Sequence, residues 1–125
     1  MKVLLINGSP HKKGCTYTAL SEVAKQLGTQ GVETEFFHIG NRPVGGCTAC
    51  GACAKTKRCI FGEDGVNECI ELAAQADGII VGSPVHYAGA AGSISGFLDR
   101  MFYMKSSLFA CKPAAGVVSC RRGGA

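Results

Sequence analysis

The sequence predicts an α/β fold in which a doubly wound parallel sheet is flanked by helices. Short, almost entirely apolar runs, typical of strands buried on both faces, alternate with longer segments whose apolar residues recur at helical spacing. Such alternation implies parallel strands joined by helical crossovers. With 125 residues, of which 46% are apolar and 18% charged, the chain fits one domain spanning residues 1–125.

The first strand, helix and second strand follow from the N-terminal segment. Residues 2–6 form a nearly continuous apolar run that ends at Asn7, as a strand buried on both faces does. Apolar residues then recur on a single helical face over residues 19–27, and Gly28 marks the end of this helix. Residues 32–39, with two phenylalanines at their centre, predict the second strand.

The second half of the chain predicts two more helices and two more strands. Residues 66–76 and 94–102 have helical spacing, whereas 78–82 and 114–119 are short apolar strands. A domain of this kind ordinarily closes with one more helix and an edge strand. The sequence therefore predicts a sheet that is truncated after its fourth strand, with the C-terminal strand and helix absent.

Charge and composition exclude several classes of protein. The net charge of +4 comes from 13 basic and 9 acidic residues, and the basic ones form short clusters in loops. Such clusters suit a small anionic ligand better than a nucleic-acid backbone, so no nucleic-acid partner is expected. The sequence has neither a signal peptide nor a membrane-spanning run, which predicts a cytoplasmic protein without a membrane partner. Eight cysteines in a reducing compartment favour metal, cluster or redox chemistry over disulfides.

A phosphate-binding loop is predicted between the first strand and the first helix. In α/β folds, free N–H groups and the positive end of the helix dipole converge at this turn. Gly14-Cys15-Thr16 lacks the lysine of a Walker loop, and the dinucleotide pattern G-x-G-x-x-G is absent. In the alternative interpretation, Ser9-Pro10 is only a turn and Thr16 only an N-terminal cap. The loop reads Gly8-Ser9-Pro10-His11-Lys12-Lys13-Gly14-Cys15-Thr16.

Two further segments follow strands and are expected at the same edge of the sheet, because ligands of such folds bind beyond the carboxyl ends of the strands. They are Ser83-Pro84-Val85-His86-Tyr87 and Ser119-Cys120-Arg121-Arg122-Gly123-Gly124. Together with Phe97-Leu98-Asp99-Arg100 and Lys112-Pro113, these loops make the sequence resemble the NADPH-dependent FMN reductase and iron–sulfur flavoprotein group of the flavodoxin-like superfamily. The resemblance covers essentially the whole chain.

The resemblance implies a cofactor site for FMN, and the chemistry is carried by the flavin rather than by a catalytic side chain. Many relatives have asparagine in place of Cys15. Arg121 and Arg122 are expected to place positive charge near the flavin N1 and O2, or else to be solvated loop residues. His86 is expected to stack on or edge the ring, or only to pack or face solvent. The implied residues are Ser9, His11, Gly14, Cys15 and Thr16 around the phosphate, Pro84, Val85, His86 and Tyr87 along the isoalloxazine ring, and Ser119, Cys120, Arg121, Arg122 and Gly123 near its pyrimidine edge.

A cysteine-rich insertion spans residues 40–65, where little periodicity remains. Cys47, Cys50, Cys53 and Cys59 have the spacing C-x2-C-x2-C-x5-C within thirteen residues. This spacing is similar to that of ferredoxins and favours a [4Fe–4S] cluster over structural zinc, and the resemblance to iron–sulfur flavoproteins favours the same cluster. A merely structural or empty cysteine loop is the alternative. The other cysteines considered, Cys69, Cys111 and Cys120, are expected to be small core or loop residues.

The sequence therefore predicts an FMN-dependent oxidoreductase that takes electrons from NAD(P)H or a reduced partner. The acceptor is a small molecule or a protein, reached directly or through the cluster. A metal-free quinone or nitro-compound reductase is one alternative, and a non-catalytic electron carrier like a flavodoxin is another. The resemblance further implies a homodimer or homotetramer.

Overall fold

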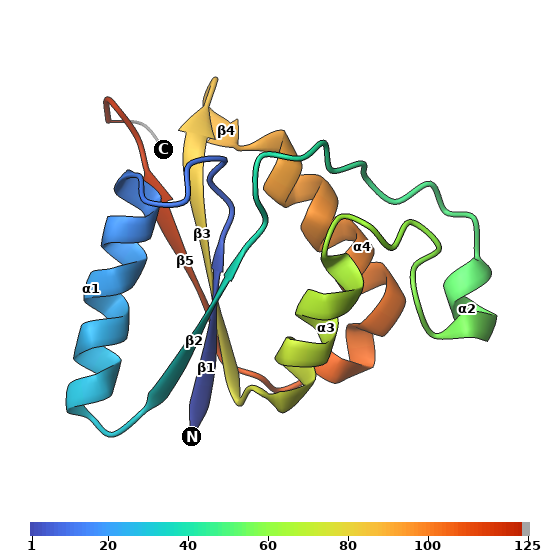
Figure 1. The fold of residues 1–125 in the computed structure, drawn as a ribbon, viewed down its shortest axis with the longest axis horizontal. Helices are drawn as coiled ribbons and strands as arrows, with labels where there is room; N and C mark the ends of the chain where they lie inside the picture. The colour runs from blue at the N-terminus through green and yellow to red at the C-terminus, as the bar shows by residue number, and fades with distance from the viewer. Residues whose placement is uncertain (124–125) are drawn as a thin grey trace.

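The computed structural model describes residues 1–123 and is built around a central sheet (Figure 1). Its elements are β1 (Lys2–Asn7), α1 (Cys15–Thr29), β2 (Glu33–His38), α2 (Ala52–Thr56), α3 (Val66–Gln75), β3 (Gly78–His86), β4 (Gly89–Ala90), α4 (Gly92–Phe109) and β5 (Ala114–Ser119). The four longer strands run parallel in the order β2-β1-β3-β5, and β4 pairs antiparallel with the end of β3. The predicted α/β fold with a doubly wound parallel sheet is confirmed.

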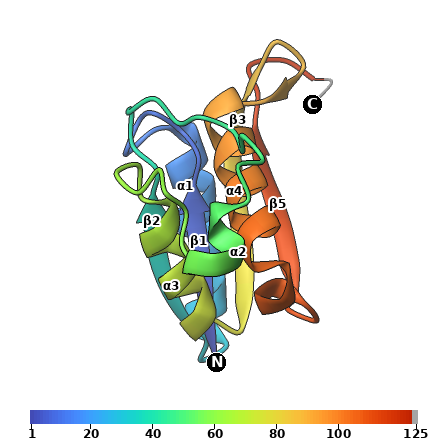
Figure 2. The ribbon, with the colours of Figure 1, turned by 90° about the vertical axis from the view of Figure 1, so that its right-hand side faces the viewer.

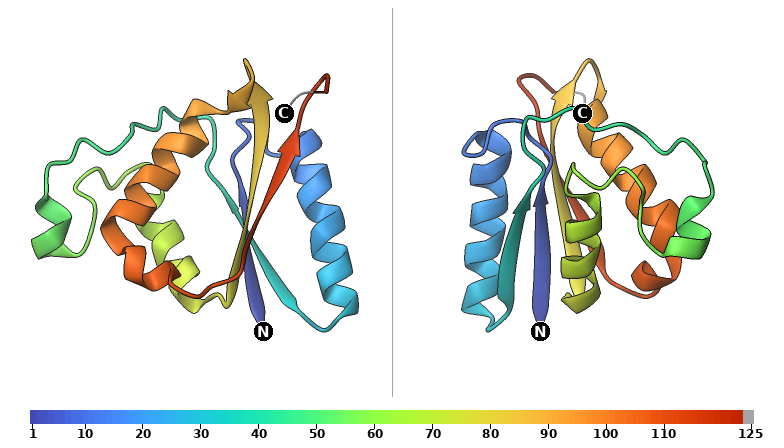
Figure 3. Two further views of the ribbon diagram at one scale, coloured as in Figure 1. Left: turned by 180° about the vertical axis from the view of Figure 1, so that it is seen from behind. Right: turned by 45° about the vertical axis from the view of Figure 1, so that its right-hand side comes forward.

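Helices cover both faces of the sheet, which explains why β1 is apolar at successive positions. Figures 1 and 3 show α1 on one face and α3 and α4 on the other. Successive side chains of a strand point to opposite faces. Leu4 and Ile6 accordingly pack in the core under α3 and α4, whereas Val3 and Leu5 pack against Leu20 of α1.

The structure extends the third predicted strand. It was expected to end at Gly82, but β3 continues to His86 and turns back into β4. The continuation of β3 beyond Gly82 is not evident from the sequence, because Ser83-Pro84 is typical of a turn. Two non-glycine residues at the tip, Tyr87 and Ala88, have positive φ angles of 48° and 61°, as two-residue hairpin turns require.

The last helix is also longer than predicted. α4 starts at Gly92 rather than Ile94 and continues to Phe109, with a bend at Lys105, whose φ and ψ are −138° and 41°. Lys105, Ser106 and Ser107 interrupt the apolar periodicity at this bend, so the sequence pattern predicts a helix that ends at residue 102 instead of residue 109. Within residues 1–123, the structure contains no helix with the length and apolar character needed to cross a membrane.

Candidate functional site

Three predicted cofactor-binding segments meet at the carboxyl edge of the sheet (Figure 1). Gly8 N, in the loop after β1, donates a 2.8 Å hydrogen bond to Gly82 O of β3. At the start of α1, the hydroxyl of Thr16 is hydrogen-bonded to the hydroxyl of Ser119, at the end of β5, over 2.8 Å. The structure therefore brings the loop after β1 and the start of α1 together with the carboxyl-terminal parts of β3 and β5.

The loop after β1 is ordered by its own side chains. Asn7 Oδ1 accepts a hydrogen bond from Ser9 N, and Ser9 Oγ accepts one from His11 N, each over 3.1 Å. α1 begins at Cys15, and its N-cap residue Gly14 makes no side-chain capping bond among the described residues. The N–H groups of the first helical turn are therefore available to an anion.

Thr16 is not the N-terminal cap that the alternative interpretation requires. The cap is Gly14, and Thr16 lies inside the first turn with a side chain that is 1% exposed. Ser9 is also buried, whereas the side chains of His11 and Cys15 are exposed. The loop thus combines the buried hydroxyl groups of Ser9 and Thr16 with solvent-exposed side chains at His11 and Cys15.

Gly8→Ala is expected to lower the free energy of unfolding by about 1–3 kcal/mol, the usual range for overpacking. A Cβ at Gly8 would lie 2.7 Å from Gly82 O and 2.8 Å from Ile94 Cβ, and neither the backbone of β3 nor the buried Ile94 can move away easily. Urea denaturation measures the loss. Gly28→Ala is the matched control, since a Cβ there meets nothing within 4 Å. Equal stability of the two variants would show that the close approach at Gly8 is unimportant.

The second segment forms a hairpin rather than a simple loop. Ser83 Oγ accepts a 3.0 Å hydrogen bond from Ala91 N and so ties the two ends of the hairpin together. Pro84 lies opposite Ser119 of β5 and Val85 opposite Ala90 of β4. Both are half-buried.

The predicted ring-binding side chains at the tip of this hairpin project into solvent. His86 is exposed, and the relative exposure of Tyr87 is 105%. Such side chains are accessible to a ligand at the carboxyl edge of the sheet.

The third segment follows β5 and is exposed from Cys120 to Gly123. Arg121 and Arg122 make no ion pair within residues 1–123 and present their charges to solvent. Gly124, which the sequence also assigned to this segment, lies outside the described residues. The structure places both arginines beyond the end of a strand adjacent to β3.

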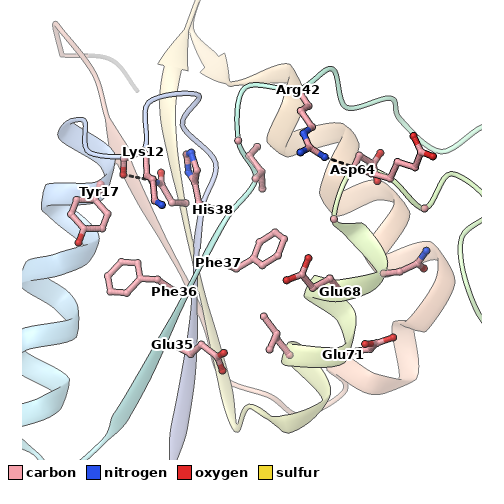
Figure 4. Close-up of a pocket in the computed structure, with 18 of the residues that line it drawn as sticks. Lys12, Tyr17, Glu35, Phe36, Phe37, His38, Arg42, Asp64, Glu68 and Glu71 are labelled. Carbon is pink, nitrogen blue, oxygen red and sulfur yellow. Dashed lines mark hydrogen bonds between the residues drawn. The ribbon is translucent and has the colours of Figure 1, made fainter.

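A separate cavity of about 740 Å³ lies along β2 (Figure 4). Phe36 faces Tyr17 of α1, with ring centroids 5.4 Å apart, while Phe37 points toward α3. Lys12 and His38 lie at one end of the cavity, and Glu71 at the other. Lys12 belongs to the predicted phosphate-binding loop, but the other residues of that loop and the residues predicted along the flavin ring do not line this cavity.

The pKa of His38 lies below its ordinary value of about 6.5, because burial disfavours the charged imidazole and the positive charge of Lys12 adds to this effect. The folded state therefore binds this proton less tightly than the unfolded state. The stabilising contribution is complete above about pH 6.5 and is lost as the pH falls through the folded-state pKa.

Lys12→Gln is expected to raise the pKa of His38 toward 6.5, and His38→Gln to reduce the loss of stability between about pH 7 and pH 5. NMR titration of the imidazole measures the pKa, and urea denaturation at each pH measures the stability. A His38 pKa at or above 6.5 in the unmodified protein would contradict this account.

The four cysteines predicted to bind a cluster line one pocket beside α4. Cys47 and Cys50 are exposed, and Cys53 and Cys59 are partly buried. Figure 2 shows the segment that carries them, with the unpredicted helix α2, lying outside α3 and α4. Among residues 1–123, no three potential ligands are grouped closely enough to hold one metal ion. The structure therefore brings the four side chains to one pocket without arranging them around a common centre.

Cys59 is held more firmly than the other three. Asn67, at the start of α3, accepts a hydrogen bond from Cys59 N and donates one to Cys59 O, both over 2.9 Å. Arg100 of α4 donates to Cys59 Sγ from Nε and Nη2, over 3.3 and 3.2 Å. Two helices thus fix the backbone and the sulfur atom of this residue.

Arg100 was not predicted as a site residue. In the structure it is only 3% exposed. It forms an ion pair with Asp64 and donates to Phe61 O and, over 3.4 Å, to Gly45 O. Burial lowers the pKa of Arg100, but the hydrogen bonds to Asp64 and Cys59 outweigh burial and leave this pKa above its ordinary value. The sequence offered one signal, because Arg100 belongs to Phe97-Leu98-Asp99-Arg100, one of the segments on which the resemblance to the family rests.

The chain matches a known family over its whole length. The family model described as NADPH-dependent FMN reductase matches residues 1–125. An iron–sulfur flavoprotein of Methanosarcina thermophila is 36% identical, in a match that covers 99% of this chain and 66% of the relative. An iron–sulfur flavoprotein of Methanocaldococcus jannaschii is 34% identical, over 80% of this chain and 51% of the relative. The chain spans about half to two thirds of the length of these curated relatives.

Solved structures share the fold at lower identity. An NAD(P)H:quinone oxidoreductase from Methanothermobacter marburgensis superposes with a TM-score of 0.69 at 18% identity, over 96% of this chain and 64% of that protein. At this identity the likeness concerns the fold alone. It agrees with the flavodoxin-like strand order β2-β1-β3 observed here.

Proposed function

Since this chain belongs to the NADPH-dependent FMN reductase family, we propose that it forms the FMN-binding part of an oxidoreductase. The enzyme takes electrons from NAD(P)H or a reduced partner and passes them to a small-molecule or protein acceptor. Bound FMN supplies the hydride and single-electron chemistry, so the protein has to bind, orient and shield the flavin. The observation that carries the proposal is the meeting of the loop after β1 and the start of α1 with the carboxyl-terminal parts of β3 and β5.

The phosphate group of FMN fits the first loop. The uncapped first turn of α1 offers backbone N–H donors, and the helix dipole favours an anion there. The buried hydroxyls of Ser9 and Thr16 lie beside this turn, and exposed Lys12 and Lys13 add positive charge. These groups would hold the phosphate and set the position of the rest of the flavin.

The hairpin and the third loop would contact the flavin ring. His86 and Tyr87 carry exposed rings at the hairpin tip, and aromatic side chains pack well against planar ligands. Arg121 and Arg122 extend from the end of β5, next to β3. Positive charge from either arginine would stabilise negative charge on the pyrimidine edge of a reduced flavin.

We also propose that Cys47, Cys50, Cys53 and Cys59 bind a [4Fe–4S] cluster. Their sulfur donors suit iron, and all four line the same pocket, whose walls include the apolar side chains of Ile60 and Met104. The names of the relatives, which are iron–sulfur flavoproteins, support this proposal. A cluster would let the protein exchange single electrons with its partner.

Anaerobic purification of the complete protein tests both proposals. We expect one FMN, about four iron and about four sulfide ions per chain, and rapid bleaching of the flavin absorbance by NAD(P)H. A yellow, iron-free protein with full reductase activity would overturn the cluster and favour a metal-free reductase. A flavin that NAD(P)H does not bleach would favour an electron carrier. Failure to retain or take up FMN would overturn the central proposal.

A further inference from the structure

The cysteine loop, residues 40–65, is attached to α4 near both of its ends by the buried side chain of Arg100. Arg100 contacts Gly45 at the beginning of the loop and Cys59, Phe61 and Asp64 at its end. Its guanidinium group has five N–H donors in a rigid plane, and such a plane can serve several acceptors at once. A lysine, with one point-like charge, cannot reproduce this pattern.

The beginning of the loop is also packed directly against α4. A Cβ at Gly96 would lie 3.1 Å from Gly46 N and 3.3 Å from Gly45 C. The two backbones can approach this closely because Gly96 has no side chain. The helix turn that carries Arg100 is therefore in contact with the chain just before Cys47.

The four predicted ligands differ in how they are held. The backbone of Cys59 is fixed by Asn67, and its sulfur atom accepts two hydrogen bonds from Arg100. For Cys47, the described contact of the sulfur atom is a 3.4 Å hydrogen bond from Ala49 N, two residues away. Cys59 is thus the ligand that the core of the domain fixes in place.

We propose that Arg100 is a positioning residue for the cysteine site, which anchors Cys59 and tunes the electron affinity of a cluster bound there. This inference rests on the proposed cluster. Hydrogen bonds to ligand sulfur atoms, together with nearby positive charge, stabilise the additional electron of a reduced cluster and so raise its reduction potential. The ion pair with Asp64 orients the guanidinium group toward the sulfur atom.

The test compares Arg100→Gln and Arg100→Lys with Arg58→Gln in the complete, anaerobically reconstituted protein. Arg58 is the control because its ion pair with Glu71 lies on the surface, where both side chains are more than 60% exposed. We expect both Arg100 variants to lose iron to a chelator roughly 10–100-fold faster, the usual effect of removing a contact to a metal ligand. We also expect a more negative cluster potential in a redox titration, with unchanged FMN content. Iron loss and potential equal to those of Arg58→Gln would overturn the proposal.

A second measurement uses metal-free protein and does not depend on the cluster. At about pH 10, where free thiols are largely ionised, the rate at which iodoacetamide modifies Cys59, relative to Cys50, is expected to rise about tenfold in Arg100→Gln, because the thiolate loses two charge-assisted hydrogen bonds that hold its sulfur atom against α4. An unchanged ratio would overturn the anchoring of Cys59. An unmodified protein that binds no iron would instead overturn the proposed cluster, and the modification rates would still decide whether Arg100 anchors Cys59.

Discussion

Phe97→Ala is expected to lower the free energy of unfolding by about 3–5 kcal/mol, as large-to-small substitutions of buried aromatic residues do. The side chain, on α4, is 0% exposed and packs in the core with residues of β1, β2 and α3, and its ring centroid lies 5.8 Å from that of Phe37. Its removal leaves a cavity that the neighbouring strands cannot fill. Because whole domains are stable by only about 5–15 kcal/mol, we expect a large shift of the urea midpoint.

Phe102→Ala is the matched control on the same helix. Phe102 is 43% exposed and contacts Phe109 edge to face, with ring centroids 4.7 Å apart. We expect a loss of at most about 1.5 kcal/mol, the upper range for an aromatic pair. If the two variants were equally stable, α4 would not be packed against the sheet as described.

Cys50→Ser is expected to remove most of the iron and sulfide from the anaerobically purified protein while FMN is retained. A serine hydroxyl is a poor replacement for a thiolate ligand. Cys50 is exposed, so the substitution leaves the core unchanged. Iron and sulfide assays, together with the visible spectrum, measure the result.

Cys111→Ser controls for the general effect of losing a thiol. Cys111 is exposed and lies between α4 and β5, outside the cysteine pocket. We expect it to keep the iron content of the unmodified protein. Full iron content in Cys50→Ser as well would exclude Cys50 as a ligand.

The main elements of the fold were predictable because hydrophobic burial leaves a periodic pattern in the sequence. β5 was predicted at residues 114–119, as observed, and α3 to within one residue at its C-terminal end. The end of β3 was not predictable, since Pro84 signals a turn even where the hairpin with β4 accommodates it. The short helix α2 has too few residues to produce a recognisable period.

Much less of the cysteine site was predictable. The spacing of the cysteines predicted that the four would lie together, and all four line one pocket. The contact between Arg100 and Cys59, however, joins residues 41 positions apart. Asn67 likewise is a residue type that is ordinary near the start of a helix, yet it fixes the backbone of Cys59. Such contacts depend on how α3 and α4 pack together, and no local pattern records that packing.

The hydrogen bonds within and between the three loops at the sheet edge have a consequence for affinity. Asn7 and Ser9 already order the first loop, and the hydroxyl contact between Thr16 and Ser119 already fixes the start of α1 against β5. The conformational entropy of these segments is therefore lost during folding and not at the moment of binding. A preorganised site of this kind retains more of its contact energy as affinity. The binding free energy of FMN should then depend mainly on the side chains that become ordered only on binding. These are the exposed side chains of His86, Tyr87, Arg121 and Arg122.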